Sequence, residues 1–129
     1  MAAGKYSFIL EQGTTTSFEI QYKDASSNPI DLTGYTGRMQ IRSDYADNTP
    51  TTYADITTTP NVDGSGLDFT GLGGGYPTTS GSIGIYISAD LTSTFTFDTA
   101  KYDLELYKDS TVIRLLEGQI KLSKEVTRS

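Results

Sequence analysis

Two acidic side chains, Asp103 and Glu105, are the clearest candidates for chemistry in this sequence. They lie two residues apart, so on a strand they would share a face, and glycoside hydrolases use a pair of carboxylates. The chain has no histidine and no cysteine, which removes the usual general base and the thiol nucleophile. Two carboxylates on one strand face usually form a solvated stripe, and tryptophan, a common sugar platform, is absent. We therefore predict no catalytic residue and no enzyme activity.

Two turn-like segments are candidates for binding an ion or a phosphate. Residues 61–68 (NVDGSGLD) are rich in the oxygen ligands that Ca²⁺ prefers, but they lack the twelve-residue EF-hand spacing and its closing glutamate. Residues 71–75 (GLGGG) lack the Lys-Ser/Thr of a phosphate-binding loop. Plain turns explain both segments better, so we expect no metal and no cofactor.

The charge balance restricts the possible partners. Sixteen acidic and ten basic residues give a formal net charge of −6 at pH 7. This balance argues against binding the phosphates of nucleic acid or an anionic membrane surface. The apolar runs are too short for a membrane-spanning helix, and the first residues lack the apolar core of a signal peptide. We expect a single domain over residues 1–129 that does not enter a membrane by itself.

Short runs of alternating apolar and polar residues predict a series of strands. In residues 14–22 and 38–42 the apolar side chains fall on every second position, as in half-buried strands. One short helical turn is expected near residues 88–95, with Ser88 as its N-cap. Residues 71–80 should form a flexible crossing, because they contain three consecutive glycines and a proline. Further strands are predicted at residues 6–10, 53–58, 67–69, 82–88 and 102–107.

The last predicted hairpin has a strand whose apolar residues do not keep one period. Between residues 112 and 122 the apolar positions are odd at Ile113 and Leu115 but even at Ile120 and Leu122. Either Arg114 enters a mostly apolar face, or a β-bulge switches the phase. We prefer a bulge near residues 117–118, because glycine tolerates the positive φ that a bulge can demand. All four residues then face inward.

Together these elements predict an all-β protein. Strong strand formers and turn signals about every ten residues are typical of an antiparallel β-sandwich, immunoglobulin-like or jelly-roll-like. We expect about 7–9 short strands, with the helical turn near residues 88–95 as the one helical element.

Six short motifs resemble those of a known family. They are DLTG (31–34), RMQIR (38–42), ISA (87–89), YDLEL (102–106), RLLEG (114–118) and EVTR (125–128), in that order. The set resembles a small β-sandwich protein of tailed-phage and prophage structural clusters, similar to the N-terminal module of some phage baseplate upper proteins. The chain departs from the pattern at Lys124, where the family usually has proline. The resemblance implies a virion component that is made in the host cytoplasm and acts by protein–protein contact.

We therefore expect a virion structural protein, an adaptor or ring subunit at the baseplate or the tail-fibre attachment region. Its partners would be other phage structural proteins in a symmetric oligomer or ring. A neck or capsid decoration protein is an alternative position. A carbohydrate- or receptor-binding module is the alternative function, with its sugar contacts at Tyr35, Tyr45, Tyr53 and Tyr76. The residues predicted at the protein interface are Arg114, Glu117, Glu125, Val126, Thr127 and Arg128.

Overall fold

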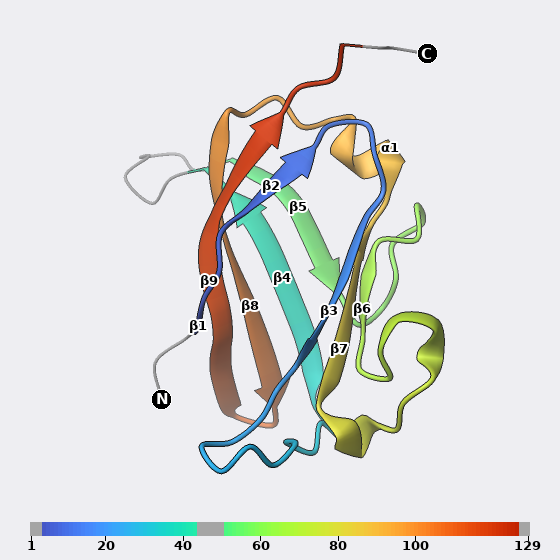
Figure 1. Cartoon of the computed structure of the whole chain (residues 1–129), viewed down its shortest axis with the longest axis vertical. Coiled ribbons are helices and arrows are strands. Elements are labelled where there is room, and N and C mark those ends of the chain that lie inside the picture. The colour runs from blue at the N-terminus through green and yellow to red at the C-terminus, as the bar shows by residue number, and fades with distance from the viewer. Residues whose placement is uncertain (1–3, 44–50, 127–129) are drawn as a thin grey trace.

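The computed structural model describes residues 4–43 and 51–126, which form two β-sheets packed face to face (Figure 1). These ranges contain nine strands, as the alternating pattern predicts, and one α-helical turn with two 3₁₀ turns. The strands are β1 (Gly4–Lys5), β2 (Phe8–Glu11), β3 (Thr16–Gln21), β4 (Thr36–Arg42), β5 (Thr52–Thr57), β6 (Gly66–Asp68), β7 (Ser82–Ile87), β8 (Thr99–Lys108) and β9 (Thr111–Ser123). The helical elements are η1 (Leu72–Gly74), η2 (Thr78–Ser80) and α1 (Ala89–Thr92).

The larger sheet has the strand order β1-β9-β8-β4-β5, with β2 also paired to β9, and the smaller sheet has the order β3-β7-β6. All pairs are antiparallel except those of β1 and β2, which run parallel to β9. The predicted antiparallel sandwich is therefore confirmed, with these two short N-terminal strands as the exception. The parallel register places Phe8 and Leu10 opposite Ile120 and Leu122, so the same pairing brings apolar side chains of β2 and β9 to one face.

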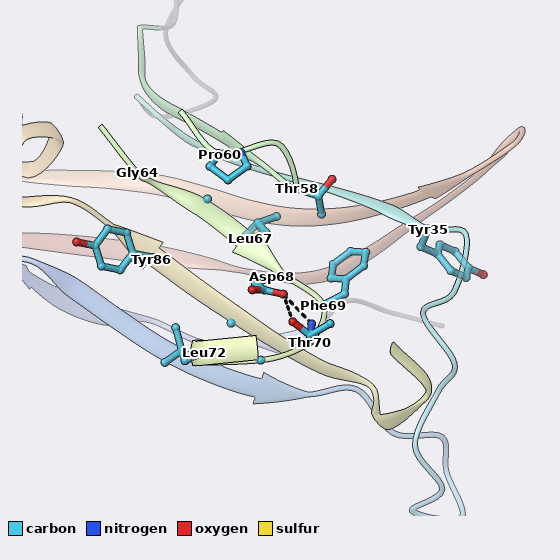
Figure 2. A pocket seen from close by; sticks show the side chains of 14 residues that line it. Tyr35, Thr58, Pro60, Gly64, Leu67, Asp68, Phe69, Thr70, Leu72 and Tyr86 are labelled. Carbon is cyan, nitrogen blue, oxygen red and sulfur yellow. Dashed lines mark hydrogen bonds between the residues drawn. The ribbon is translucent and has the colours of Figure 1, made fainter. Parts of the chain in front are cut away.

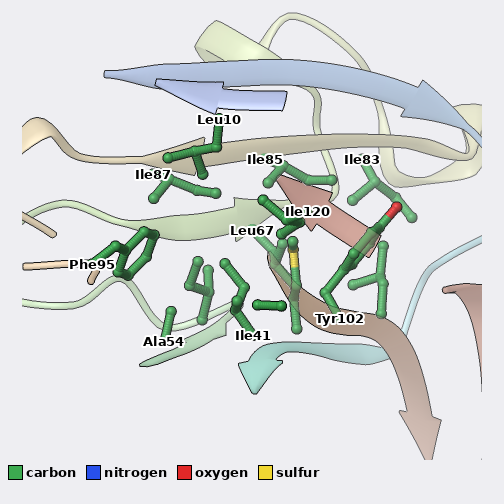
Figure 3. Close-up of a cluster of buried hydrophobic side chains, with 14 of the residues drawn as sticks. Leu10, Ile41, Ala54, Leu67, Ile83, Ile85, Ile87, Phe95, Tyr102 and Ile120 are labelled. Carbon is green, nitrogen blue, oxygen red and sulfur yellow. The ribbon is translucent and has the colours of Figure 1, made fainter. Parts of the chain in front are cut away.

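The space between the sheets is filled by the alternating apolar residues that the sequence pattern predicts (Figure 3). Met39 and Ile41 of β4 are fully buried, as are Ile83, Ile85 and Ile87 of β7. The two sheets therefore share one continuous hydrophobic core. Since successive side chains of a strand point to opposite faces, the polar residues between them must lie on the outer faces of the sandwich.

The phase change in β9 occurs at Leu115, a few residues before the predicted position. Leu104 of β8 pairs with Leu116, whereas the next residue, Glu105, pairs with Arg114, so Leu115 is the extra residue. Ile113 and Leu106 form a pair before this bulge, so Ile113 lies on the inner face as predicted, and Ile120 and Leu122 lie there after it.

Gly118 is required for a different reason from the one we proposed. It does not have a positive φ. Instead, a Cβ atom at this position would lie 1.9 Å from the carbonyl oxygen of Tyr6. The hydroxyl of Tyr102 donates a hydrogen bond of 2.5 Å to the same carbonyl. Glycine at position 118 therefore lets the first segment of the chain approach β9 closely.

The predicted helical turn is confirmed by α1. The backbone N–H of Leu91 donates to Oγ of Ser88 at 3.1 Å, so Ser88 is the N-cap. Thr92 Oγ1 donates to the carbonyl oxygen of Thr14 at 2.7 Å and ties the turn to the chain that enters β3. Phe95, which follows α1, is 1% exposed and enters the core.

Candidate functional site

The charged residues of the large sheet meet on its outer face. The strand register places Lys5 beside Glu117, Glu117 beside Asp103, and Asp103 beside Gln40. The neighbouring row runs from Arg114 through Glu105 to Arg38. Arg114 and Glu117, both predicted interface residues, therefore lie together with the two carboxylates that we considered for catalysis.

Arg114 lies among three carboxylates. Its Nε atom is 3.5 Å from Oδ2 of Asp103 and 3.6 Å from Oε2 of Glu105, and its Nη1 atom is 3.7 Å from Oε2 of Glu117. Glu117 also accepts a hydrogen bond from Nζ of Lys5. The Lys5 ammonium is the main cause of a lowered pKa of the Glu117 carboxyl. We name this group, Lys5, Asp103, Glu105, Arg114 and Glu117, the ion cluster.

Two aspartates on this face have opposite pKa shifts. Burial and the nearby charge of Glu105 raise the pKa of Asp103, and Arg114 only partly offsets them. Arg38 lowers the pKa of Asp55, because its Nε and Nη2 atoms donate to the two carboxylate oxygens at 2.9 and 2.5 Å. Asp103, Glu105 and Arg114 line a hollow of about 440 Å³ on this face. The charges of this surface are paired with one another.

A groove of about 510 Å³ lies beside β6 (Figure 2). Leu67 and Phe69 are buried at its base, and Leu72 and Tyr86 stand at its rim, 40% and 37% exposed. The Asp68 carboxylate also lines the groove. Its Oδ1 atom accepts hydrogen bonds from the backbone N–H and the hydroxyl of Thr70.

Of the four tyrosines proposed for sugar contact, the three in the described part of the chain do not form one surface. Tyr35 lines the groove beside β6, and Nζ of Lys108 lies 5.3 Å from its ring centroid. Tyr53 packs against Phe97 with 4.7 Å between ring centroids. Tyr76 lines a separate hollow, and Tyr45 lies outside the described residues.

Tyr86 was missed as a groove residue. The alternation of Ile83, Ile85 and Ile87 on β7 already indicates that Tyr86 points outward. Sequence reasoning did not use this signal, because the groove is built from three segments that are distant in the chain.

The turn considered for calcium is organised by its own hydrogen bonds. Oδ1 of Asp63 accepts the backbone N–H of Ser65 at 2.8 Å, and this bond is the main cause of a lowered pKa of the Asp63 carboxyl. The backbone N–H of Asn61 donates to the carbonyl oxygen of Ser65 at 2.9 Å. Residues 4–43 and 51–126 contain no group of three or more His, Cys, Asp or Glu placed to hold a metal.

The segment that follows β9 is fixed to the domain before it leaves. Nζ of Lys124 lies 2.8 Å from Oδ1 of Asp98, and the backbone N–H of Glu125 donates to Oε1 of Gln12 at 2.8 Å. Val126 is 97% exposed, whereas Thr127 and Arg128 lie outside the described residues. Of the predicted interface residues in this segment, Glu125 is therefore partly used by the fold, and Val126 is available to a partner.

Among the helices of the described part, none is long and apolar enough to cross a membrane.

No protein-family model matches the chain, and no curated protein matches it in sequence. Solved structures do match its fold. A crystal structure of a chicken TCR aligns with 95% of this chain at a TM-score of 0.52 and 14% sequence identity. The chain spans about half of that protein, covering 55% of it. At this identity the match concerns the fold alone, and with the strand order described above it shows an immunoglobulin-like β-sandwich.

Proposed function

We propose that this protein is a structural component of a tailed-phage virion, acting as an adaptor or ring subunit at the baseplate or the tail-fibre attachment region. The observation that carries the proposal is the ordered set of six motifs, from DLTG at residues 31–34 to EVTR at residues 125–128. The rest of the molecule is compatible with a role in assembly. It is a rigid sandwich whose charged face is internally paired, and its last described segment leaves in a fixed direction.

Most of the motifs have a role in building the sandwich. Met39 and Ile41 of RMQIR and Leu104 and Leu106 of YDLEL are buried in the core. The RLLEG motif contains the β9 bulge and the glycine that Tyr6 approaches. EVTR differs, because it begins where the chain leaves the sandwich. We therefore assign contact with a virion neighbour to residues 125–128.

The test is a change at Val126 in the phage genome that carries the gene. Val126→Asp should leave the isolated protein folded, because this side chain is 97% exposed. It should remove the protein from purified particles, as measured by mass spectrometry of the virions. Val112→Asp is the matched control, since Val112 is also exposed but lies at the far end of β9. Normal incorporation of the Val126 variant would remove residues 125–128 from the mechanism.

The groove beside β6 favours glycan binding as a second candidate function. It combines the exposed ring of Tyr86 with a carboxylate and threonine hydroxyls, the kinds of group that contact sugars. A titration of the isolated protein with cell-wall oligosaccharides, followed by NMR, should then shift the signals of Tyr86 and Asp68. Tyr86→Ala should abolish those shifts. An absence of shifts at millimolar sugar would exclude this candidate.

A further inference from the structure

Strand β3 forms one edge of the small sheet and pairs only with β7. The backbone N–H of Tyr22 donates to the carbonyl oxygen of Gly81 at 2.8 Å, in the register that continues along β3 and β7. In an antiparallel ladder, hydrogen-bonded and non-hydrogen-bonded pairs alternate. Phe18 and Ile20 therefore direct their backbone groups toward β7. The backbone groups of Ser17, Glu19 and Gln21 point away from it.

These outward backbone groups have no partner in the described part of the chain, and only the side chains of Glu19 and Gln21 bond to a neighbouring segment, at Leu72 and Ser80. The N–H and C=O groups of Ser17, Glu19 and Gln21 have no hydrogen bond to another described segment, and all three residues are exposed. Figure 1 shows β3 with β7 along one side and no strand of the small sheet along the other. Water can satisfy these groups, but they also form a template for another strand.

Natural proteins usually protect such an edge, and β3 has little protection. Its six residues, TSFEIQ, contain no proline, no lysine and no bulge, and Glu19 is their one charged residue. The edge strand of the large sheet, β5, differs, because Nδ2 of Asn61 donates to the carbonyl oxygen of Asp55 at 3.3 Å. The other edge strands, β1, β2 and β6, have only two, four and three residues, so β3 is the longest edge strand in the described chain without such a bond to an outward backbone group.

We propose that β3 pairs with β3 of a second copy, antiparallel about a two-fold axis at Phe18. Only outward residues can face outward residues across such an edge. A register with Glu19 opposite Glu19 of the second copy would place like charges together and is unfavourable. Centring on Phe18 instead places Ser17 opposite Glu19 of the second copy, and Thr16 opposite Ile20. This register keeps the whole pairing within β3.

The surroundings of Phe18 favour the same axis. Its ring lies 5.4 Å from that of Phe8 and 6.3 Å from that of Tyr6, measured between centroids. Tyr6 is 48% exposed, so an aromatic surface adjoins the edge. A second copy would cover part of it. The contact is isologous, so it uses both edges and closes as a dimer with one continuous six-stranded sheet.

This contact deepens the proposed oligomeric function by naming one interface, but its test uses the isolated full-length chain. Failure here would leave the incorporation test at Val126 unaffected, so the two proposals can fail separately.

Cysteine crosslinking tests both the contact and its register, because the natural chain has no cysteine. Residues that form a hydrogen-bonded antiparallel pair have Cα atoms about 5.5 Å apart, within the range of a disulfide. Mixing the variants Ser17→Cys and Glu19→Cys under mild oxidation should give a disulfide-linked dimer. Each variant alone should stay monomeric on a non-reducing gel, because identical positions are then diagonal neighbours about 7–8 Å apart.

Two results would overturn the proposal. A mixture that does not crosslink would exclude the pairing, and crosslinking of Glu19→Cys alone would exclude the register centred on Phe18. A second variant keeps the test independent of thiol chemistry. Ser17→Pro removes an outward N–H and leaves the β7 ladder intact, so it should weaken self-association at least tenfold in sedimentation experiments. Ser17→Thr is the matched control and should associate normally. Equal association of both variants would contradict the proposal.

Discussion

Strands β9 and β3 belong to the same sandwich, but they use their hydrogen-bonding capacity very differently. β9 pairs with β8 on one side and with β1 and β2 on the other, and its outward charges join the ion cluster. β3 has one partner strand and a plain outward sequence of Ser17, Glu19 and Gln21. β9 has the more conspicuous charged side chains, but these already have partners within the chain.

This difference shows that residue types alone do not reveal which groups already have partners within the chain. Arg114 and Glu117 have the chemistry of interface residues, since arginine pairs well with carboxylates. In the folded chain their partners are Asp103, Glu105 and Lys5. The groups of β3 without a partner in the described chain are backbone N–H and C=O groups. Nearly every residue has such groups, so side-chain types do not reveal them.

Adding a methyl group at Gly118, on the crowded edge of β9, should have the largest effect on stability of the substitutions considered. Gly118→Ala would place a Cβ atom on the carbonyl of Tyr6, so the first segment must move away from β9. We expect a loss of about 3 kcal/mol in the free energy of unfolding, measured by urea denaturation. Gly75→Ala is the matched control, because no atom lies within 4 Å of its Cβ position. It should change stability by less than about 0.5 kcal/mol. Similar values for the two variants would show that the β9 edge is not crowded.

The ion cluster should show a smaller and salt-dependent effect. Arg114→Met would leave Asp103, Glu105 and Glu117 facing one another without their shared cation. We expect a loss of about 1 kcal/mol in low salt, because the groups are partly exposed. The loss should decrease in 1 M NaCl, where such interactions are screened.

Lys101→Met is the control for this variant. Lys101 lies on the same face, next to Arg42 in the register and outside the ion cluster. Its replacement should have little effect or be slightly stabilising, since it removes a like charge beside Arg42. An equal loss for both variants would mean that Arg114 is an ordinary surface cation, and that the outward charges of β9 are available to a partner.

The features that could be predicted from the sequence are those with a local cause. The alternation of Ile83, Ile85 and Ile87 predicted a buried strand, and Ser88 predicted the start of α1, because each pattern is complete within a few residues. The immunoglobulin-like or jelly-roll-like sandwich followed from the succession of such strands. The structure and its structural neighbour select the first of these.

The features that were missed depend on contacts between distant segments. The parallel pairing of β2 with β9 joins the two ends of the described chain, and no local pattern distinguishes it from antiparallel pairing. Gly118 was noticed, but its reason, the Tyr6 carbonyl, lies more than a hundred residues away in the sequence. The position of the bulge also decides which charges share the outer face, so the ion cluster could not be assembled before Leu115 was placed.

The smallest predicted effect separates two aspartates that the sequence cannot distinguish. The folded state raises the pKa of Asp103 above its usual 3.8. Ionisation of Asp103 therefore lowers the free energy of unfolding as the pH rises through the folded pKa. The folded state lowers the pKa of Asp55, whose ionised form is stabilising above pH 3.8, and this stabilisation is lost as the pH falls through the folded pKa. At pH 7, Asp103→Asn should therefore raise the free energy of unfolding, and Asp55→Asn should lower it.

Each difference should be about 0.5 kcal/mol, because both carboxylates are partly exposed to solvent. Urea denaturation at pH 7 and again near pH 3 measures them, and each variant should approach the wild-type value at the lower pH as its aspartate becomes protonated in the wild type. The sign of the change for Asp103→Asn is the informative result. If Asp103→Asn destabilised the protein at pH 7 as Asp55→Asn does, the contacts of Arg114 would outweigh the burial of Asp103, and the ion cluster would stabilise the fold rather than merely neutralise itself.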